Sequence, residues 1–229
     1  MAEPAESPRT VRVTSRNGAV KIVADSPRAI SVEGGTVSGD DVDSDRFEVA
    51  GQNQPILVRC PPGTDVVVGT SSGRVELHGE LGDARVTTQS GRISIDSAAS
   101  VDARTRSGRI AIDRCAGSAR LQCTSGRIEV GDVAELDAAT QSGRIAGERV
   151  GRGHLSAVSG RVDLGAADGF SALEVTTVSG AVDISVPHES CPTTVLETVS
   201  GQIACDLPPG EDGRVVVRTT SGRIRVRER

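Results

Sequence analysis

The chain has 229 residues, of which 36% are hydrophobic and only two, Phe47 and Phe170, are aromatic. Its net charge of -5 argues against a general nucleic-acid-binding protein, which normally carries a positive surplus. No apolar run reaches the roughly 18 residues of a membrane span, and the aromatic platforms that small-molecule and single-stranded nucleic-acid sites generally use cannot be assembled. The core must consist of Val, Ile, Leu, Ala and Thr, a composition that favours β-strands.

The N-terminal part of the chain is interpreted as a short tail followed by an irregular β segment. Residues 1–8 are rich in Pro and Glu and are expected to be disordered. They also lack the basic and apolar regions of a signal peptide, so a cytoplasmic location is favoured, and association with the cell envelope through partners is the alternative. Residues 9–65 contain strand-like runs without a regular repeat, which is typical of the cap of a repeat protein. Within them, Asn17-Gly18 resembles a degenerate copy of the motif that follows.

From residue 66 to the C-terminus, a Ser-Gly pair recurs at steps of 17 to 21 residues. Apolar residues lie five before and two after each glycine, and also four after it except at Gly147. The residue three before is nearly always Thr. This spacing predicts two short strands, each with one buried face, on either side of a sharp corner. We expect the glycine to turn at positive φ, and the serines to point inward and hydrogen-bond to one another or to the corner backbone. The glycines are Gly73, Gly91, Gly108, Gly126, Gly143, Gly160, Gly180, Gly201 and Gly222.

A unit of this length cannot bury its own apolar face, but stacked copies can. We therefore predict an all-β fold: a β-solenoid or stacked β-strand repeat with about nine rungs of 17–21 residues over 66–229, continuous with the cap. An antiparallel meander is the alternative, since a step of 17 residues also fits successive hairpins. The copy at Gly222 is expected to be the terminal rung, and the arginines that alternate with apolar residues over 223–229 would deter edge-to-edge association.

The segment from Cys60 to Val75, CPPGTDVVVGTSSGRV, is followed by serial Thr-x-Ser-Gly-Arg-Ile copies. Together they resemble the bacterial adhesin-like β-strand-repeat family of unknown function, also called toastrack repeats. The resemblance covers roughly residues 9–229. It implies a stacked β architecture and an adhesin-like scaffold role. Its motif indicates almost nothing about catalysis or ligand binding. The residue after the glycine departs from the Asp that the family often has, because here it is mostly Arg.

This arginine position is the main candidate for a binding site. Stacked in register, the side chains would form a column about 4.8 Å apart. One interpretation is a solvated ridge, partly neutralised by nearby acids. The other is a stripe that binds an anionic polymer or an acidic partner, because guanidinium groups suit carboxylate and phosphate. The residues are Arg74, Arg92, Arg109, Arg127, Arg144, Arg161 and Arg223, interrupted by Ala181 and Gln202.

Catalytic and metal-binding constellations are not apparent in the sequence. His78, His154 and His188 lie on different units and are expected to be exposed connector residues. The acidic stretch from Asp40 to Asp45 lacks the glycine and the glutamate of a calcium loop. The cysteines are odd in number and form no C-x-x-C pair, which indicates reduced thiols; they are Cys60, Cys115, Cys123, Cys191 and Cys205, with Cys123 and Cys205 on apolar columns.

We therefore expect no cofactor, no metal and no catalysis. The favoured hypothesis is a non-enzymatic structural or protein-interaction module that binds a protein partner or self-associates. A binding module for an anionic polymer is the alternative, and a carbohydrate enzyme of the β-helix type rests on fold analogy alone. Specific nucleic-acid binding and membrane insertion are not expected.

Overall fold

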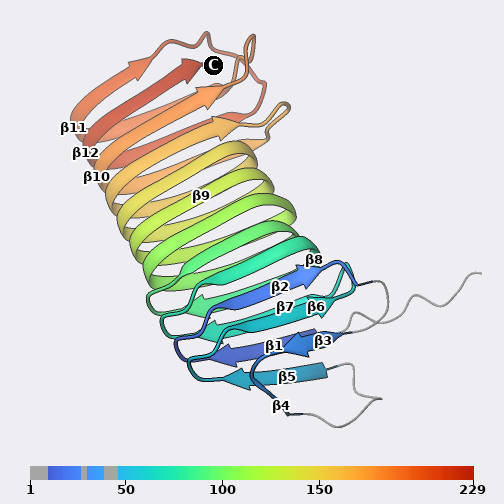
Figure 1. The fold of residues 1–229 in the computed structure, drawn as a ribbon. Coiled ribbons are helices and arrows are strands. Elements are labelled where there is room, and N and C mark those ends of the chain that lie inside the picture. Colours follow the sequence, from blue (N-terminus) through green and yellow to red (C-terminus); the bar gives the residue numbers. More distant parts are fainter. Residues whose placement is uncertain (1–9, 27–29, 39–45) are drawn as a thin grey trace, which may run out of the picture.

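The computed structural model describes residues 10–26, 30–38 and 46–229, which form a long coil of β-strands (Figure 1). The predicted tail 1–8 and the acidic stretch from Asp40 to Asp45 lie outside the described residues. Within the described part, no helix has the length and hydropathy to cross a membrane. The strands are β1 (Thr10–Ser15), β2 (Val20–Ala24), β3 (Ser31–Glu33), β4 (Thr36–Ser38), β5 (Arg46–Gly51), β6 (Ile56–Cys60), β7 (Asp65–Thr70), β8 (Val75–Thr88), β9 (Arg92–Ala166), β10 (Ala172–Val186), β11 (Thr193–Cys205) and β12 (Arg214–Glu228).

The repeat copies pair in parallel and in register, which confirms the predicted β-solenoid. Val175 of β10 pairs with Leu155 of β9 on one side and with Val217 of β12 on the other. β9 keeps strand geometry for 75 residues and passes through several turns of the coil. A meander would pair successive copies antiparallel, so the alternative fold is wrong for the repeat region. We call each turn of the coil a rung and name it by its corner glycine.

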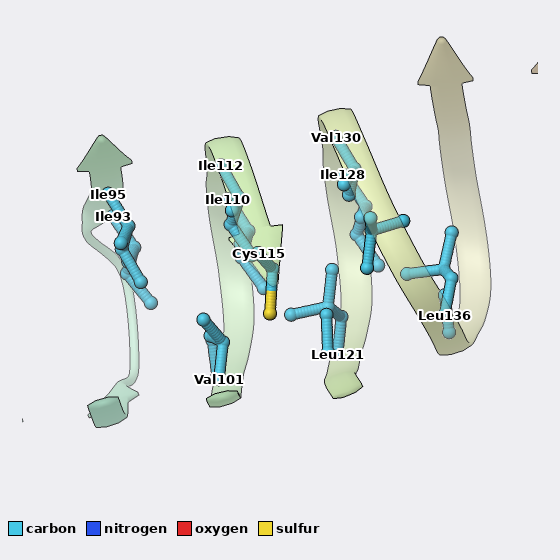
Figure 2. Close-up of a cluster of buried hydrophobic side chains, with 14 of the residues drawn as sticks. Ile93, Ile95, Val101, Ile110, Ile112, Cys115, Leu121, Ile128, Val130 and Leu136 are labelled. Carbon is cyan, nitrogen blue, oxygen red and sulfur yellow. The ribbon is translucent and has the colours of Figure 1, made fainter. Parts of the chain in front are cut away.

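The core is a set of stacked columns between the two arms of the coil. Ile93, Ile110 and Ile128 occupy the same position in successive rungs and are fully buried, and Leu121 and Leu136 meet them from the other arm (Figure 2). Each such side chain contributes about 1.5–3 kcal/mol by leaving water. Neighbouring strands of a sheet lie about 4.8 Å apart. Aliphatic side chains can stack on their own copies at this spacing, so the interior is filled almost without aromatic residues.

At the C-terminal end the spatial order of the rungs differs from their order in the sequence. β12 lies between β10 and β11, so the Gly222 rung has neighbours on both sides. The prediction that Gly222 is the terminal rung is wrong, because β11, the Gly201 rung, forms the edge (Figure 1). The arrangement buries the inward side chains of β12: Val217, Ile224 and Val226 are fully buried, whereas Cys205 of β11 is exposed.

The N-terminal end has the same inverted order. β1 and β2 lie between the rung formed by β5 and β6 and the rung formed by β7 and β8. Val13 pairs with Val68, and Val20 pairs with Val75, so this part of the predicted cap continues the ladder. The three-residue strands β3 and β4 pair antiparallel with β6 and β5 and form the outermost strands at this end.

The corner requires glycine because the neighbouring rung comes too close for a side chain. A Cβ built at Gly126 would overlap the backbone carbonyl oxygen of Gly108. The φ of Gly126 is 157°, and Gly143, Gly160 and Gly222 also have positive φ, as expected, although β9 remains a strand at Gly126. The other corner glycines do not have positive φ, so the close carbonyl is the reason that applies along the whole column. From one end to the other, the column runs Gly18, Gly73, Gly91, Gly108, Gly126, Gly143, Gly160, Gly180, Gly222 and Gly201.

The inward hydroxyls belong to the threonines, and the prediction of inward serines is wrong. The alternation of faces breaks at the corner, where the two residues before each glycine both face outward, so Ser125 and Ser142 are exposed. Thr70 is buried, and its Oγ1 accepts a hydrogen bond of 3.1 Å from the Gly73 N–H. The same oxygen of Thr88, Thr105, Thr140, Thr177, Thr198 and Thr219 is buried without a hydrogen-bond partner.

Candidate interaction surfaces

The predicted arginine column lies on the outer surface, and acidic side chains neutralise much of it. Arg144 forms an ion pair of 2.7 Å with Asp163 of the next rung. Arg109 and Arg127 both contact Glu129, and Arg74 lies 3.5 Å from Glu76. These arginines form ion pairs either within one rung or with the neighbouring rung, which is the arrangement expected of a solvated ridge. About half-exposed pairs of this kind contribute at most ~1 kcal/mol each to stability.

A second group of arginines lacks such partners. Arg92, Arg161 and Arg223 of the column form no ion pair within the described residues. The same holds for Arg225 and Arg227, which follow Arg223 on the outer face of β12. Arg161, Arg225, Arg227 and Arg229 line a hollow of about 640 Å³ with Glu148, Asp163 and Asp183. Sequence reasoning assigned the last three arginines to an edge strand, and therefore missed this hollow.

The Arg229 guanidinium bridges the wall of the hollow. Its Nη2 donates hydrogen bonds to the backbone carbonyls of Glu148, at 2.9 Å, and Ala166, at 3.0 Å. Gly165, which lies beside this guanidinium, has no side chain to fill the space. The hollow therefore combines exposed arginines that have no ion pair with one guanidinium held by backbone carbonyls.

The three histidines are paired with carboxylates, although they do not form a catalytic set. His78 lies 2.9 Å from Asp96, His154 lies 3.5 Å from Glu174 and His188 lies 2.7 Å from Glu228. The hydrogen bond from His188 is the main cause that lowers the pKa of Glu228. The partners come from other rungs, 18 to 40 residues away, which is why no local motif revealed them. Among the described residues, no hydroxyl or thiol hydrogen-bonds to these imidazoles.

The cysteines divide by burial. Cys60, Cys115 and Cys123 are buried, and burial raises the pKa of each thiol. Cys191 is half-buried, and Cys205 is exposed although it lies on an apolar column, because its rung is the last. No group of His, Cys, Asp or Glu in residues 10–26, 30–38 and 46–229 could hold a metal ion.

An exposed apolar stripe follows the position two residues before the corner glycine. Val158 is 47% exposed, Val178 is 49% exposed and Val199 is 85% exposed. The same position in the earlier rungs carries polar residues: Ser71, Gln89, Arg106, Thr124 and Gln141. We call these three residues the valine stripe. It lies at the C-terminal end of the solenoid, in the rungs nearest the open edge, with Thr220 between Val178 and Val199.

At the edge formed by β11, one side of the strand has no pairing partner and the core columns are partly exposed. Among the described residues β11 pairs only with β12. Ile203 is 45% exposed, whereas Ile224 at the same position of β12 is fully buried. At the other end of the solenoid, the outermost strands are only three residues long.

Comparison with known proteins places the architecture within a recognised group. The family model described as Toastrack DUF4097 matches residues 3–228. No curated protein matches the chain by sequence. Among solved structures, one from Clostridium sporogenes ATCC 15579, described as "a putative cell adhesion protein", shares 8% identity with a TM-score of 0.26. That match covers 97% of this chain and 94% of the other, but a TM-score of this size carries no argument about function.

Proposed function

The chain belongs to the Toastrack DUF4097 family, and from this membership we propose that it is a non-enzymatic protein-interaction module built as a rigid β-solenoid. The valine stripe is the observation that carries the proposal. Its side chains occupy one repeat position in three of the last four rungs, with Thr220 in the fourth, so they lie along one line. Lines of exposed apolar residues rimmed by polar ones mark interaction sites in soluble proteins. The serines exposed one residue after each valine supply such a rim.

Photo-cross-linking tests the proposal directly. A photoreactive phenylalanine analogue placed at Val178 in cells of the source organism should give a discrete adduct with a partner protein. The matched control places it at Gln141, which has the same position in an earlier rung and is also exposed. The proposal fails if Val178 gives no adduct, or if both positions give the same adducts.

A second candidate function is the binding of an anionic polymer, and the unpaired arginines of the hollow favour it. Arg161, Arg225 and Arg227 hold no ion pair within the described residues, so an incoming phosphate or carboxylate would displace no existing partner. Arginine forks suit such groups. At Arg109, Arg127 and Arg144, by contrast, an anion must compete with Glu129 or Asp163.

Polyphosphate titrations at low and moderate salt separate the two groups of arginines. The double variant Arg225→Ser with Arg227→Ser should weaken binding at least tenfold, while Arg109→Ser with Arg127→Ser should change it less than threefold. Binding should also fall steeply with salt, as expected for neutralised phosphates. No binding, or an equal loss in both variants, would dismiss the hollow as an anion site.

A further inference from the structure

We propose that the open edge of β11 is a docking site for an extended, basic segment of a partner protein, which adds in parallel as one more rung. The proposal rests on the function as an interaction module and names the chemistry of one partner. Three features of the described residues support it: free main-chain groups, incomplete apolar columns and the distribution of charge.

The main-chain groups on one side of β11 have no strand to bind. The Thr193 N–H donates to the carbonyl of Gly213, at 2.9 Å, toward β12. Alternate residues of a parallel strand direct their backbone groups to opposite neighbours, so the N–H groups of Thr194 and Leu196 point to the open side. On the other arm, the Asp206 N–H donates to the carbonyl of Val226, at 3.1 Å, which leaves the Ile203 N–H on the open side. A partner strand could therefore form regularly spaced backbone hydrogen bonds with this side of β11.

The core columns also stop unfinished at this edge. Leu196 is only partly buried, and Ile203 and Cys205 are exposed, although their counterparts in β12 are fully buried. A terminal repeat that ends a solenoid normally carries a polar outer face. β11 instead has one charged side chain in 13 residues, Glu197, which binds Arg218 of β12 at 3.1 Å. An exposed edge of this kind is a template for another strand.

The charge around the edge specifies the partner. Residues 187–213, which comprise β11 and the loops on either side, contain five acidic residues and no Lys or Arg. Acidic and basic residues are equal in number in the rest of the chain, at 26 each, so this segment accounts for the whole net charge of -5. The strand that already pairs with β11 is basic: β12 carries Arg214, Arg218, Arg223, Arg225 and Arg227. A basic strand therefore suits the open side as well.

The same charge disfavours a second copy of this chain as the occupant, because two acidic ends would face each other. The size of the edge fits a short segment. A strand along all 13 residues would span about 43 Å and bury about 900 Å² in total, if it covers a band about 10 Å wide. This area belongs to the class of weak and transient complexes.

A peptide with the sequence of residues 214–229 is the natural probe, since β12, which lies within this sequence, pairs with β11 in the structure. Its binding to the intact protein is measured by fluorescence anisotropy, with a scrambled peptide of the same composition as the control. Micromolar binding is expected for the ordered peptide, and binding at least tenfold weaker for the scrambled one. Equal binding of the two peptides would overturn the proposal, because charge alone would then explain it.

Two variants of β11 locate the binding site. Ile203→Lys places a charge on an exposed end column, and Thr194→Pro removes an N–H that points to the open side, so both should fold. Each should weaken binding at least tenfold. Val37→Lys changes a residue of β4 that is 50% exposed at the other end and should stay within twofold of the wild type. Unchanged binding in both folded β11 variants would overturn the proposal.

Two further measurements exclude other occupants. Amide exchange of β12 should remain slow in the complex; fast exchange would mean that the peptide replaces β12, and would overturn the proposal. Sedimentation should show a monomer, and a dimer abolished by Ile203→Lys alone would assign the edge to a second copy. The Val178 cross-link should survive Ile203→Lys, which separates a failure of this proposal from a failure of the interaction function.

Discussion

Replacing a corner glycine by alanine tests the packing of the whole solenoid. At Gly108, a Cβ would overlap the backbone carbonyl oxygen of Gly91, and no side-chain rotation can relieve contact with a backbone atom. The two rungs must separate at the corner. We expect this to break about two ladder hydrogen bonds, at about 1 kcal/mol each, with a further cost for groups left unpaired. The loss of stability is therefore about 2–4 kcal/mol, which lowers the melting temperature by roughly 5–12 °C in a domain of this size.

Four single variants measured by thermal melting and urea titration decide this. Gly126→Ala should cost at least as much as Gly108→Ala, because the same contact operates at both positions and Gly126 also has a positive φ. Gly201→Ala should cost less, since the end rung can shift outward. Gly69→Ala is the control, because nothing lies within 4 Å of its Cβ, and it should be neutral or stabilising by up to ~1 kcal/mol. The reasoning is refuted if Gly108→Ala melts within 1 °C of the wild type, or if Gly201→Ala is equally harmful.

Three other predictions follow from burial. Ile128→Asp should prevent soluble expression because it buries an unpaired charge, whereas Arg127→Ser should change the free energy of unfolding by less than ~0.5 kcal/mol; similar yields would contradict the assigned faces. Thr140→Val should stabilise by up to ~1 kcal/mol because the Thr140 hydroxyl has no hydrogen-bond partner, whereas Thr70→Val should destabilise by about 1 kcal/mol because the Gly73 N–H loses its acceptor. Urea melts that show a change of the same sign for both variants would count against this account. Cys205 should react fastest with a thiol reagent, and the buried Cys60, Cys115 and Cys123 should react slowly. Because burial raises the pKa of these three thiols, only their unfolded forms ionise just above pH 9, so the free energy of unfolding from urea melts should fall as the pH rises above about 9.

The stacked architecture could be predicted because each rung repeats the same local pattern. The column that contains Ile93, Ile110 and Ile128 is visible as an unbroken period in the sequence, and the structure buries all three. The reason for the corner glycine could not be predicted in the same way. It depends on the backbone carbonyl of the neighbouring rung, which a Cβ would overlap. A sequence pattern shows that glycine recurs, but it does not show which atoms lie next to it.

The features missed by sequence reasoning all depend on the order of rungs in space. The Gly201 and Gly222 rungs carry the same motif, so nothing local shows that β12 inserts between β10 and β11. This exchange exposes Cys205 and Ile203 and gathers Arg225 and Arg227 beside Arg161. The two copies differ in one respect that could have indicated which is the inner one. β12 has Val217, Ile224 and Val226 at the positions where β11 has Leu196, Ile203 and Cys205. The more β-branched copy occupies the inner position.

The inverted rung order at both ends also determines how the molecule bears tension. β1 is held by β5 and β7, and β12 is held by β10 and β11, so the first and last described strands are each bonded along both edges. A force applied along these strands must shear two ladders at once, whereas an outermost strand could be peeled away one bond at a time. The solenoid is therefore expected to resist pulling from residues 10 and 228 more strongly than pulling from within β11.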